Sequence, residues 1–423
     1  MKKLLLPLLF CMIIALFSAD DAHAEDNTVV MRPEHSVPVV SIETANGVKI
    51  GRKKTAAYVQ VTLSITDQHG ELILLDEFAA ARVRGNSTST AQKKAYNIKL
   101  SESADLFGMG SASKWALLAN AYDKTLLRNK LAYDFAGELG LEGSPKSCFV
   151  DLYLNGKYLG CYQLTQTIEM SRSCVDLHPS KDEFILEIQP REGYSCPVFL
   201  YTPRYNLRFG LDGVDILSDE QRESLTDFLL QAETALSSGE EAQIRKYFDI
   251  DSFLDAYIVH EVFKNIDVAS SSTRFYIKDG VIFAGPVWDF DLSCGNTSDK
   301  YYKQHNEGDY TLASPERWFA RCLWWKPLFN CGWFEQAFAD RYRELQPLIV
   351  NLYEDNELGI SRIDRICASA GECIAANFEE AGWSISKRHG VFEREPDSSY
   401  AENLEFLREW LRQRNQWILD NLS

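Results

Sequence analysis

The chain has few basic residues for its length. Its 423 residues include 44 lysines and arginines against 61 aspartates and glutamates, which gives a formal net charge of −17. A protein of this charge repels the phosphate backbone of nucleic acids and the surface of anionic lipids. We therefore expect no nucleic-acid partner.

Long apolar runs are scarce as well. The run from Leu4 to Phe17 is shorter than the roughly 20 residues that a helix needs to cross a bilayer, and no later segment is long and apolar enough. Lys2 and Lys3 precede this run and Ala22-His23-Ala24 follows it, which is the pattern of a cleavable export signal. The sequence predicts a signal peptide over residues 1–24, cleavage after Ala24, a secreted or extracytoplasmic protein and no membrane span.

Several common site motifs are also missing. The sequence contains no Gly-x-Ser-x-Gly elbow and no His-Glu-x-x-His pair, which argues against an α/β-hydrolase and a zinc protease. It contains no Cys-x-x-Cys or Cys/His array, so a structural zinc site of that kind is not expected. A glycoside hydrolase with two acids stays open, because the separation of two acids is a spatial quantity.

Nine cysteines would remain after removal of the signal peptide. Export to an oxidising compartment favours some disulfide bonds, but the number is odd and spacing does not reveal connectivity.

The hydrophobic pattern changes from β to α along the chain. After a polar leader over residues 25–36, Tyr58 to Ile65 alternates in the manner of a half-buried strand, and Asn155-Gly156 between two apolar runs predicts a hairpin. From Ser218 onward apolar residues recur at helical spacing, apart from a hairpin predicted within 273–291. We expect an α+β fold in which a β-rich N-terminal lobe (37–215) and a helical C-terminal lobe (216–423) share one cleft. Further expected elements are strands at 37–43, 77–83, 95–100 and 184–188 and helices at 124–139, 219–237, 241–264 and most of 315–423.

Three carboxylates stand near the two arms of the later predicted hairpin. Asp267 follows a helix, and Asp289 and Asp291 belong to the run Trp288-Asp-Phe-Asp291. Convergent carboxylates can hold magnesium against nucleotide phosphates while another accepts a proton from a hydroxyl. Taken alone, a trio of acids is more often structural, with Asp267 capping a turn and Asp289 and Asp291 on a solvated loop.

A second group of residues could contact phosphates. The turn Arg84-Gly85-Asn86-Ser87 is rich in small residues and backbone donors, and Lys99 follows on the next predicted strand. Such a turn can surround a phosphate, and a lysine can neutralise it. The alternative is a polar hairpin turn with a surface lysine.

Three other polar residues are expected to be structural. Arg128 and Asn129 lie on the helix that Asp123 is expected to cap, where polar groups usually fix a neighbouring loop or face solvent. His260 lies on an apolar helix and is expected to pack in the core.

Together these segments resemble the CotH (spore coat protein H) family of atypical kinases. The matching stretches occur in family order and extend over about residues 38–420. They are RVRGNST (82–88), KKAYNIKL (93–100), KWALLANAYDKTLLRNKLAYDFAGELG (114–140), SPKSCFVDLYLNGKYLGCYQLT (144–165), KNID (264–267) and AGPVWDFDLSCGN (284–296).

The resemblance implies an atypical protein-kinase-like, two-lobed fold. It implies transfer of the ATP γ-phosphate to Ser or Thr of exported, coat or envelope proteins, with Mg²⁺ or Mn²⁺ as cofactor. By motif, Asp267 would be the catalytic acid-base residue, and Asp289 and Asp291 would bind the metal. Lys99 would contact the α and β phosphates, and Arg84, Asn86 and Ser87 would lie over the nucleotide.

The chain departs from the kinase pattern at several positions. Gln166 stands where the family commonly has Glu, Ser272 stands where ordinary kinases have a metal-binding Asn, and Ser89 replaces an aromatic residue. The Glu that would pair with Lys99 is not evident, with Glu138 and Glu169 as candidates. A catalytically inactive, structural or adhesive envelope protein of this family is therefore the alternative.

Overall fold

The computed structural model describes residues 34–51, 57–298 and 312–422. The expected signal peptide and most of the expected leader lie outside these residues. Within them, no helix has the length and apolarity required to pass through a membrane.

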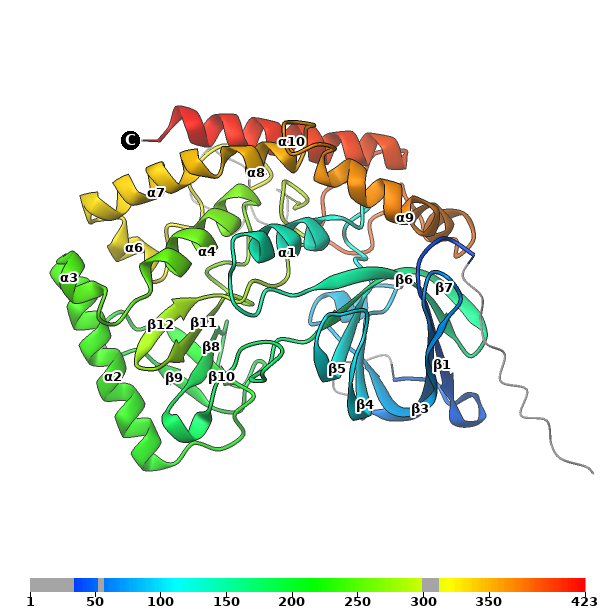
Figure 1. Ribbon diagram of the computed structural model, residues 1–423, viewed down its shortest axis with the longest axis horizontal. Helices are drawn as coiled ribbons and strands as arrows, with labels where there is room; N and C mark the ends of the chain where they lie inside the picture. Colours follow the sequence, from blue (N-terminus) through cyan, green and yellow to red (C-terminus); the bar gives the residue numbers. More distant parts are fainter. Residues whose placement is uncertain (1–33, 52–56, 299–311, 423) are drawn as a thin grey trace, which may run out of the picture. The chain divides into compact units, whose positions relative to one another are not determined.

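The first part of the chain forms a closed barrel of seven strands (Figure 1). Neighbouring strands are antiparallel except for β1 and β6, which run parallel and close the barrel. The alternation predicted near Tyr58 is confirmed, because Val61, Leu63 and Ile65 point into the barrel core. In chain order the strands are β1 (Val39–Thr44), β2 (Val59–Thr66), β3 (Leu72–Val83), β4 (Tyr96–Asp105), β5 (Ser111–Leu118), β6 (Ser147–Leu154) and β7 (Lys157–Gln166).

The hairpin between β6 and β7 confirms the Asn-Gly prediction. Asn155 and Gly156 have φ values of 50° and 70°. Two successive positive φ values define the tight turn whose twist matches that of paired strands, and Asn-Gly tolerates them best. The local sequence therefore determines the β6–β7 turn, while the parallel pairing of β1 with β6 closes the barrel.

A second, five-stranded antiparallel sheet follows. Its spatial order is β12-β11-β8-β10-β9, with Arg274 of β11 opposite Glu187 of β8. Strands from both sides of the division expected at residue 215 therefore share one sheet. The strands are β8 (Phe184–Ile188), β9 (Phe199–Tyr201), β10 (Arg208–Asp212), β11 (Arg274–Lys278) and β12 (Val281–Ala284).

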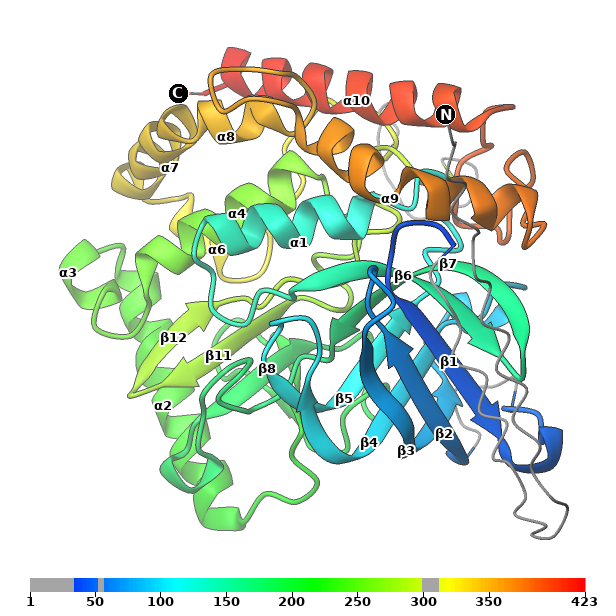
Figure 2. The ribbon, with the colours of Figure 1, turned by 45° about the vertical axis from the view of Figure 1, so that its right-hand side comes forward.

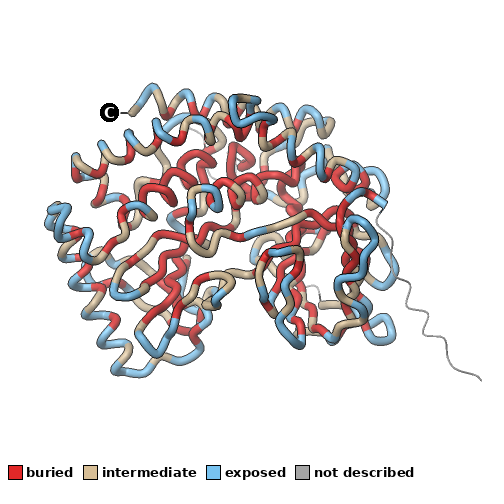
Figure 3. Tube along the Cα trace, viewed as in Figure 1, coloured by how far each residue is buried: buried red, intermediate tan, exposed pale blue. Residues whose placement is uncertain are grey.

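Most of the helices lie along one side of the barrel and the sheet, whereas α2 and α3 lie beside the sheet, away from this layer (Figures 1 and 2). α4 is buried on almost every side and packs against α1, α7, α10 and β12, whereas α9 covers β6 and β7 (Figure 3). The helices are α1 (Arg128–Glu138), α2 (Asp219–Ser238), α3 (Glu241–Ile244), α4 (Ile250–Val262), α6 (Trp325–Leu328), α7 (Gly332–Glu344), α8 (Gln346–Asn351), α9 (Arg362–Glu379) and α10 (Tyr400–Asp420). Short 3₁₀ turns occur at η1 (Ala45–Gly47), η2 (Thr88–Thr90) and η3 (Pro179–Lys181).

Two expected helices differ from those observed. The helix expected from residue 124 begins at Arg128, because the Asp123 carboxylate accepts hydrogen bonds from the backbone N–H groups of Thr125 and Arg128 and holds a turn there. The helix expected over 241–264 is divided into α3 and α4, since Asp249 caps a new helix through the N–H of Ser252.

The cysteines of the described residues are all free thiols. Cys161 on β7 and Cys373 on α9 lie within hydrogen-bond reach of each other. The expectation of disulfide bonds is therefore not met in this structure.

Candidate functional site

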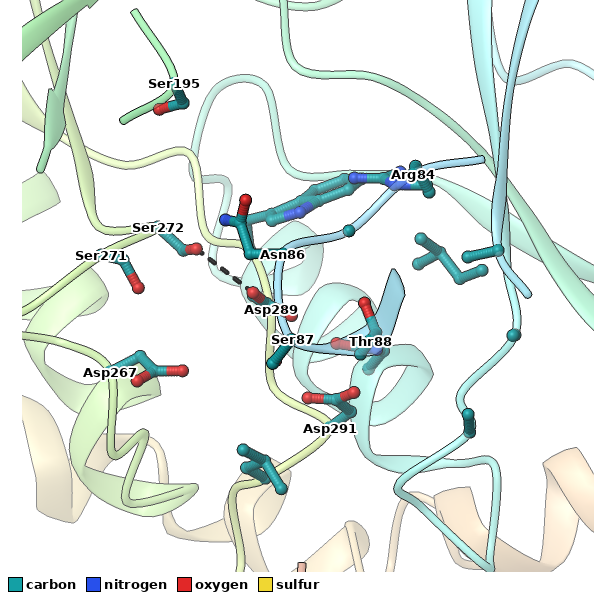
Figure 4. Close-up of a pocket in the computed structure, with 18 of the residues that line it drawn as sticks. Arg84, Asn86, Ser87, Thr88, Ser195, Asp267, Ser271, Ser272, Asp289 and Asp291 are labelled. Carbon is teal, nitrogen blue, oxygen red and sulfur yellow. Dashed lines mark hydrogen bonds between the residues drawn. The ribbon is translucent and has the colours of Figure 1, made fainter. Parts of the chain in front are cut away.

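A pocket of about 460 Å³ lies between the barrel and the five-stranded sheet. The barrel strands contribute Arg82 and Asn97, and the loop after β3 contributes Arg84, Asn86, Ser87 and Thr88. The sheet contributes Glu187, Asp212 and Arg274, and two connecting segments contribute Asp267, Asp289 and Asp291. Figure 4 shows the three aspartates facing the loop that carries Asn86 and Ser87.

The three aspartates lie close enough to repel one another. Burial raises the pKa of Asp267 to about 7, and the charge of Asp289 adds to the rise. Burial and the charges of Asp289 and Asp267 raise the pKa of Asp291 well above its usual range. Burial also raises the pKa of Asp289, although the Arg84 guanidinium and Ser272 oppose this shift. Like charges in a partly dry pocket need a cation or protons to be stable there.

Two side chains of α1 hold the loop that carries Asp289 and Asp291 in place. The N–H of Phe290 donates to Asn129 Oδ1 at 2.7 Å, and Asn129 Nδ2 donates to Asn120 Oδ1 at 2.9 Å. Arg128 Nε donates to the carbonyl of Ser293 at 3.0 Å. These contacts give Arg128 and Asn129 the structural role expected for them, because they hold the loop in which Asp289 adopts a φ of 69°.

Ser272 takes part in the site. Its Oγ donates to Asp289 Oδ2 at 3.2 Å, drawn as a dashed line in Figure 4. Arg274 Nη1 donates to the carbonyl of Ser272 at 3.1 Å, while Arg274 Nη2 donates to Glu187 Oε1 at 2.6 Å. The serine therefore orients the Asp289 carboxylate, and a buried ion pair fixes the serine.

Arg84 lines the pocket and has a guanidinium nitrogen without a hydrogen-bond partner. Its guanidinium lies 4.9 Å from the centre of the Trp288 ring, and that ring stacks on Tyr133 at 5.5 Å. Arg84 Nη1 is buried and has no hydrogen-bond partner. Since a buried donor without a partner is costly, this nitrogen indicates where an anionic ligand would bind.

The turn after Arg84 requires its glycine. Gly85 has a φ of 95°, and a Cβ there would lie 2.0 Å from Thr88 Oγ1. Ser89 Oγ donates to the carbonyl of Asn86 at 2.7 Å and closes the turn. This tight turn places Asn86, Ser87 and Thr88 on the wall of the pocket.

The structure does not bring Lys99 to the pocket. Lys99 is exposed on β4, where it lies opposite Ala80 and Lys114, and it is not among the residues that line the pocket. Asn97, which pairs with Arg82, lines it instead. Two residues of a strand span about 6.6 Å, so Lys99 lies about that far along β4 from Asn97, the residue that lines the pocket.

The candidate partners of Lys99 are engaged elsewhere. Glu138 pairs with Arg362, and Glu169 pairs with Lys114 at 3.1 Å. Gln166 donates to the carbonyls of Met109 and Gly110 at 2.7 Å and lines a different pocket. The basic residues that line the pocket are Arg82, Arg84 and Arg274, and Lys99 is not among them.

The donor set fits a hard divalent cation. Among the described residues, the three aspartates do not form a cluster in which every ligand atom lies within 4.8 Å of the others. Mg²⁺ does not need such a cluster, since it is usually held by one or two carboxylates together with substrate phosphates and water. Asp289 and Asp291 would hold the ion, and Asp267 would remain available for a proton.

Three carboxylates and an arginine nitrogen without a hydrogen-bond partner thus line one pocket between the barrel and the five-stranded sheet. The chain belongs to the CotH kinase family: the sequence model described as CotH kinase protein matches residues 81–418, which include every pocket residue named above. The resemblance is thereby confirmed. No curated protein matches the chain in sequence.

The sequence did not reveal Tyr133, Glu187 or Arg274 as pocket residues, and Trp288 was named only as part of the run that carries Asp289 and Asp291. Trp288 and Tyr133 support Arg84, and Arg274 with Glu187 supports Ser272. Trp288 adjoins Asp289 in sequence and so offered a signal, whereas Tyr133 and Glu187 reach the pocket only through tertiary packing.

We expect Asp267→Asn to raise the stability of the metal-free protein at neutral pH. An acid whose pKa rises from 3.8 to about 7 on folding binds more protons in the folded state, so its ionisation costs stability as pH rises from about 4 to 7. Asparagine cannot ionise and still accepts the hydrogen bond from Ser270. Thermal unfolding in a chelator at pH 5 and pH 8 should show a gain for the variant that grows with pH.

The exposed Asp215, which lies outside the pocket, provides the control. Asp215→Asn should shift the melting temperature equally at both pH values. A variant at Asp267 that is less stable than wild type at pH 8 would contradict the raised pKa of the Asp267 carboxyl group.

Proposed function

We propose that the protein is a secreted kinase that transfers the γ-phosphate of ATP to Ser or Thr hydroxyls of exported, coat or envelope proteins. The observation that carries the proposal is the convergence of Asp267, Asp289 and Asp291 opposite the unpartnered nitrogen of Arg84 in one pocket. Membership of the CotH kinase family supports the same reaction class. In this proposal the barrel acts as the N-terminal lobe, and the sheet with its helices acts as the C-terminal lobe.

In this proposal one wall of the pocket binds the metal and the opposite wall binds the phosphates. Asp289 and Asp291 would hold Mg²⁺ or Mn²⁺, and Asn129 and Ser272 keep the loop and the Asp289 carboxylate in place. The ion, when bound, neutralises charge on the phosphates. Arg84 donates to a phosphate oxygen from the opposite wall, and the turn with Asn86 and Ser87 covers the nucleotide.

Asp267 accepts the proton of the substrate hydroxyl. As that proton leaves, the hydroxyl oxygen bonds to the γ-phosphorus and the bond from this phosphorus to the oxygen of ADP breaks. A base works best when its pKa lies near the operating pH, and burial raises the pKa of Asp267 to about 7. Exposed Ser270 and partly exposed Ser271 flank Asp267, so the acceptor side chain can enter at this edge of the pocket.

The test is phosphate transfer with identification of the acceptor. The chain beginning at Glu25 is incubated with Mg²⁺ or Mn²⁺, γ-labelled ATP and Ser/Thr-rich acceptor proteins, and labelled amino acids are separated after hydrolysis. We expect phosphoserine or phosphothreonine. Absence of label with both metals, together with absence of ATP binding, would instead support the inactive envelope protein.

Arg84→Gln should raise the KM for ATP by about tenfold to a hundredfold. A hydrogen bond to a charged group contributes about 1.5–3 kcal/mol, and each 1.4 kcal/mol is a factor of ten. Lys99→Gln is the matched comparison, because it removes a cation that lies outside the pocket. Initial rates over a range of ATP concentrations should show a KM change for the Arg84 variant alone. A larger change for Lys99→Gln would instead assign the phosphate contact to Lys99.

A further inference from the structure

A second cluster of possible metal ligands lies outside the pocket. Glu34 and His35 precede β1, and Glu380 directly follows α9. One ligand atom from each of these residues lies within 4.8 Å of the other two. No other His/Cys/Asp/Glu trio in residues 34–51, 57–298 and 312–422 meets this condition.

The histidine is oriented by a buried carboxylate. His35 Nδ1 lies 2.8 Å from Asp151 Oδ2, and the side chain of Asp151 is 1% exposed. Tyr158 donates its hydroxyl hydrogen to the other Asp151 oxygen at 2.8 Å. The carboxylate accepts, so we assign the proton to Nδ1 and leave Nε2 facing Glu380. A carboxylate that fixes one nitrogen so that the other can bind a metal is the usual support of a metal-binding histidine.

The remaining nitrogen faces an acceptor. Nε2 lies 3.1 Å from Glu380 Oε1, and both atoms offer lone pairs when the ring is neutral. A proton on Nε2 would satisfy this one contact, whereas a metal ion would also satisfy Glu34. Two ligands at about 2.0–2.2 Å from a tetrahedral Zn²⁺ lie roughly 3.3–3.5 Å apart, close to the spacing observed here.

The two segments that carry these ligands already meet. Ser36 Oγ donates to Glu372 Oε2 of α9 at 2.7 Å, and the N–H of Asp151 donates to the carbonyl of Pro38 at 2.9 Å. α9 packs on β6 and β7, so the trio lies where the N-terminal segment, the barrel and α9 come together. A metal here would join partners that are positioned in advance.

We propose that Glu34, His35 and Glu380 bind one Zn²⁺ ion, with water completing the coordination, and that this ion fastens the segment before β1 to the end of α9. Glu34 and His35 lie before the family match, which begins at residue 81, whereas Glu380 lies within it. The proposal does not depend on the kinase assignment.

The test is calorimetric titration of chelator-treated protein with ZnCl₂. Wild type should bind one Zn²⁺ at this site, and Glu34→Gln and Glu380→Gln should each weaken binding at least tenfold while leaving the fold intact, since both side chains are exposed. Glu379→Gln, an exposed neighbour outside the trio, is the matched control and should bind as wild type does. Asp289→Asn should keep this binding, which separates the trio from the pocket.

Cobalt substitution identifies the ligand type. A site of histidine and carboxylates should give Co²⁺ visible absorption without the near-ultraviolet thiolate charge-transfer band, and His35→Gln should remove the visible absorption. Absence of Zn²⁺ binding in wild type, binding unchanged in Glu34→Gln and Glu380→Gln, or a thiolate band would each overturn the proposal. In the first case His35 serves as a protonated bridge between Asp151 and Glu380.

Discussion

Asp267→Asn should lower the rate of phosphate transfer by about 10²–10⁴-fold, the range that a positioned general base contributes. Asparagine keeps the size of the side chain and its hydrogen bond from Ser270, but it cannot accept the proton of the acceptor hydroxyl. Because Asp289 and Asp291 would hold the metal, the affinity for Mg-ATP should remain within a few fold of wild type. Single-turnover phosphate transfer and a separate nucleotide-binding titration measure the two quantities independently.

The comparison variant for this experiment is Ser270→Ala. It removes the hydrogen bond to Asp267 without removing the carboxylate, so its rate should fall far less than that of Asp267→Asn. If Asp267→Asn transferred phosphate as fast as wild type, the base would have to be another residue. If instead the variant lost nucleotide binding, Asp267 would belong to the metal site.

Asp289→Asn should lower kcat/KM by about 10³-fold or more. The loss of a catalytic metal ion removes several kcal/mol of transition-state stabilisation, and each 1.36 kcal/mol is a factor of ten. The substitution is nearly isosteric, and the hydrogen bond from Ser272 can be retained, so the loop should keep its conformation. Initial rates across a range of Mg²⁺ concentrations should show that added metal does not restore the wild-type rate.

Asp215→Asn changes the net charge by the same amount outside the pocket and should leave kcat/KM unchanged. Asp291→Asn tests whether Asp291 holds the metal ion together with Asp289. A loss as large as that of Asp289→Asn is expected if both carboxylates hold the ion. Full activity of Asp289→Asn at ordinary Mg²⁺ concentration would contradict the proposed metal site.

Much of the secondary structure could be predicted because its signals are local. Alternation identified β2, and Asn155-Gly156 identified the β6–β7 hairpin by its turn chemistry. The partner of β8 could not be predicted, since a short apolar run is equally compatible with either sheet. Only the tertiary structure shows that β8 pairs with β11 across a long sequence separation.

In the candidate site, too, some residues could be predicted from local motifs and others depend on the tertiary structure. Asp267, Asp289, Asp291 and Arg84 were predicted from motifs, and the structure brings all four to one pocket. Lys99 was placed by analogy with a strand motif, but it is exposed and lies two residues beyond Asn97, the β4 residue that lines the pocket. Ser272 was read as a departure from the kinase pattern, yet its hydroxyl reaches Asp289, a contact that depends on how the chain folds back after β12.

Calorimetric titration of the protein with ATP, in the presence and absence of Mg²⁺, tests the central claim most directly. A pocket of three mutually repelling carboxylates should bind the nucleotide well only when the metal is present, and Asp289→Asn should abolish that dependence by abolishing binding. Equal ATP binding with and without Mg²⁺, or binding that survives in Asp289→Asn, would contradict the account.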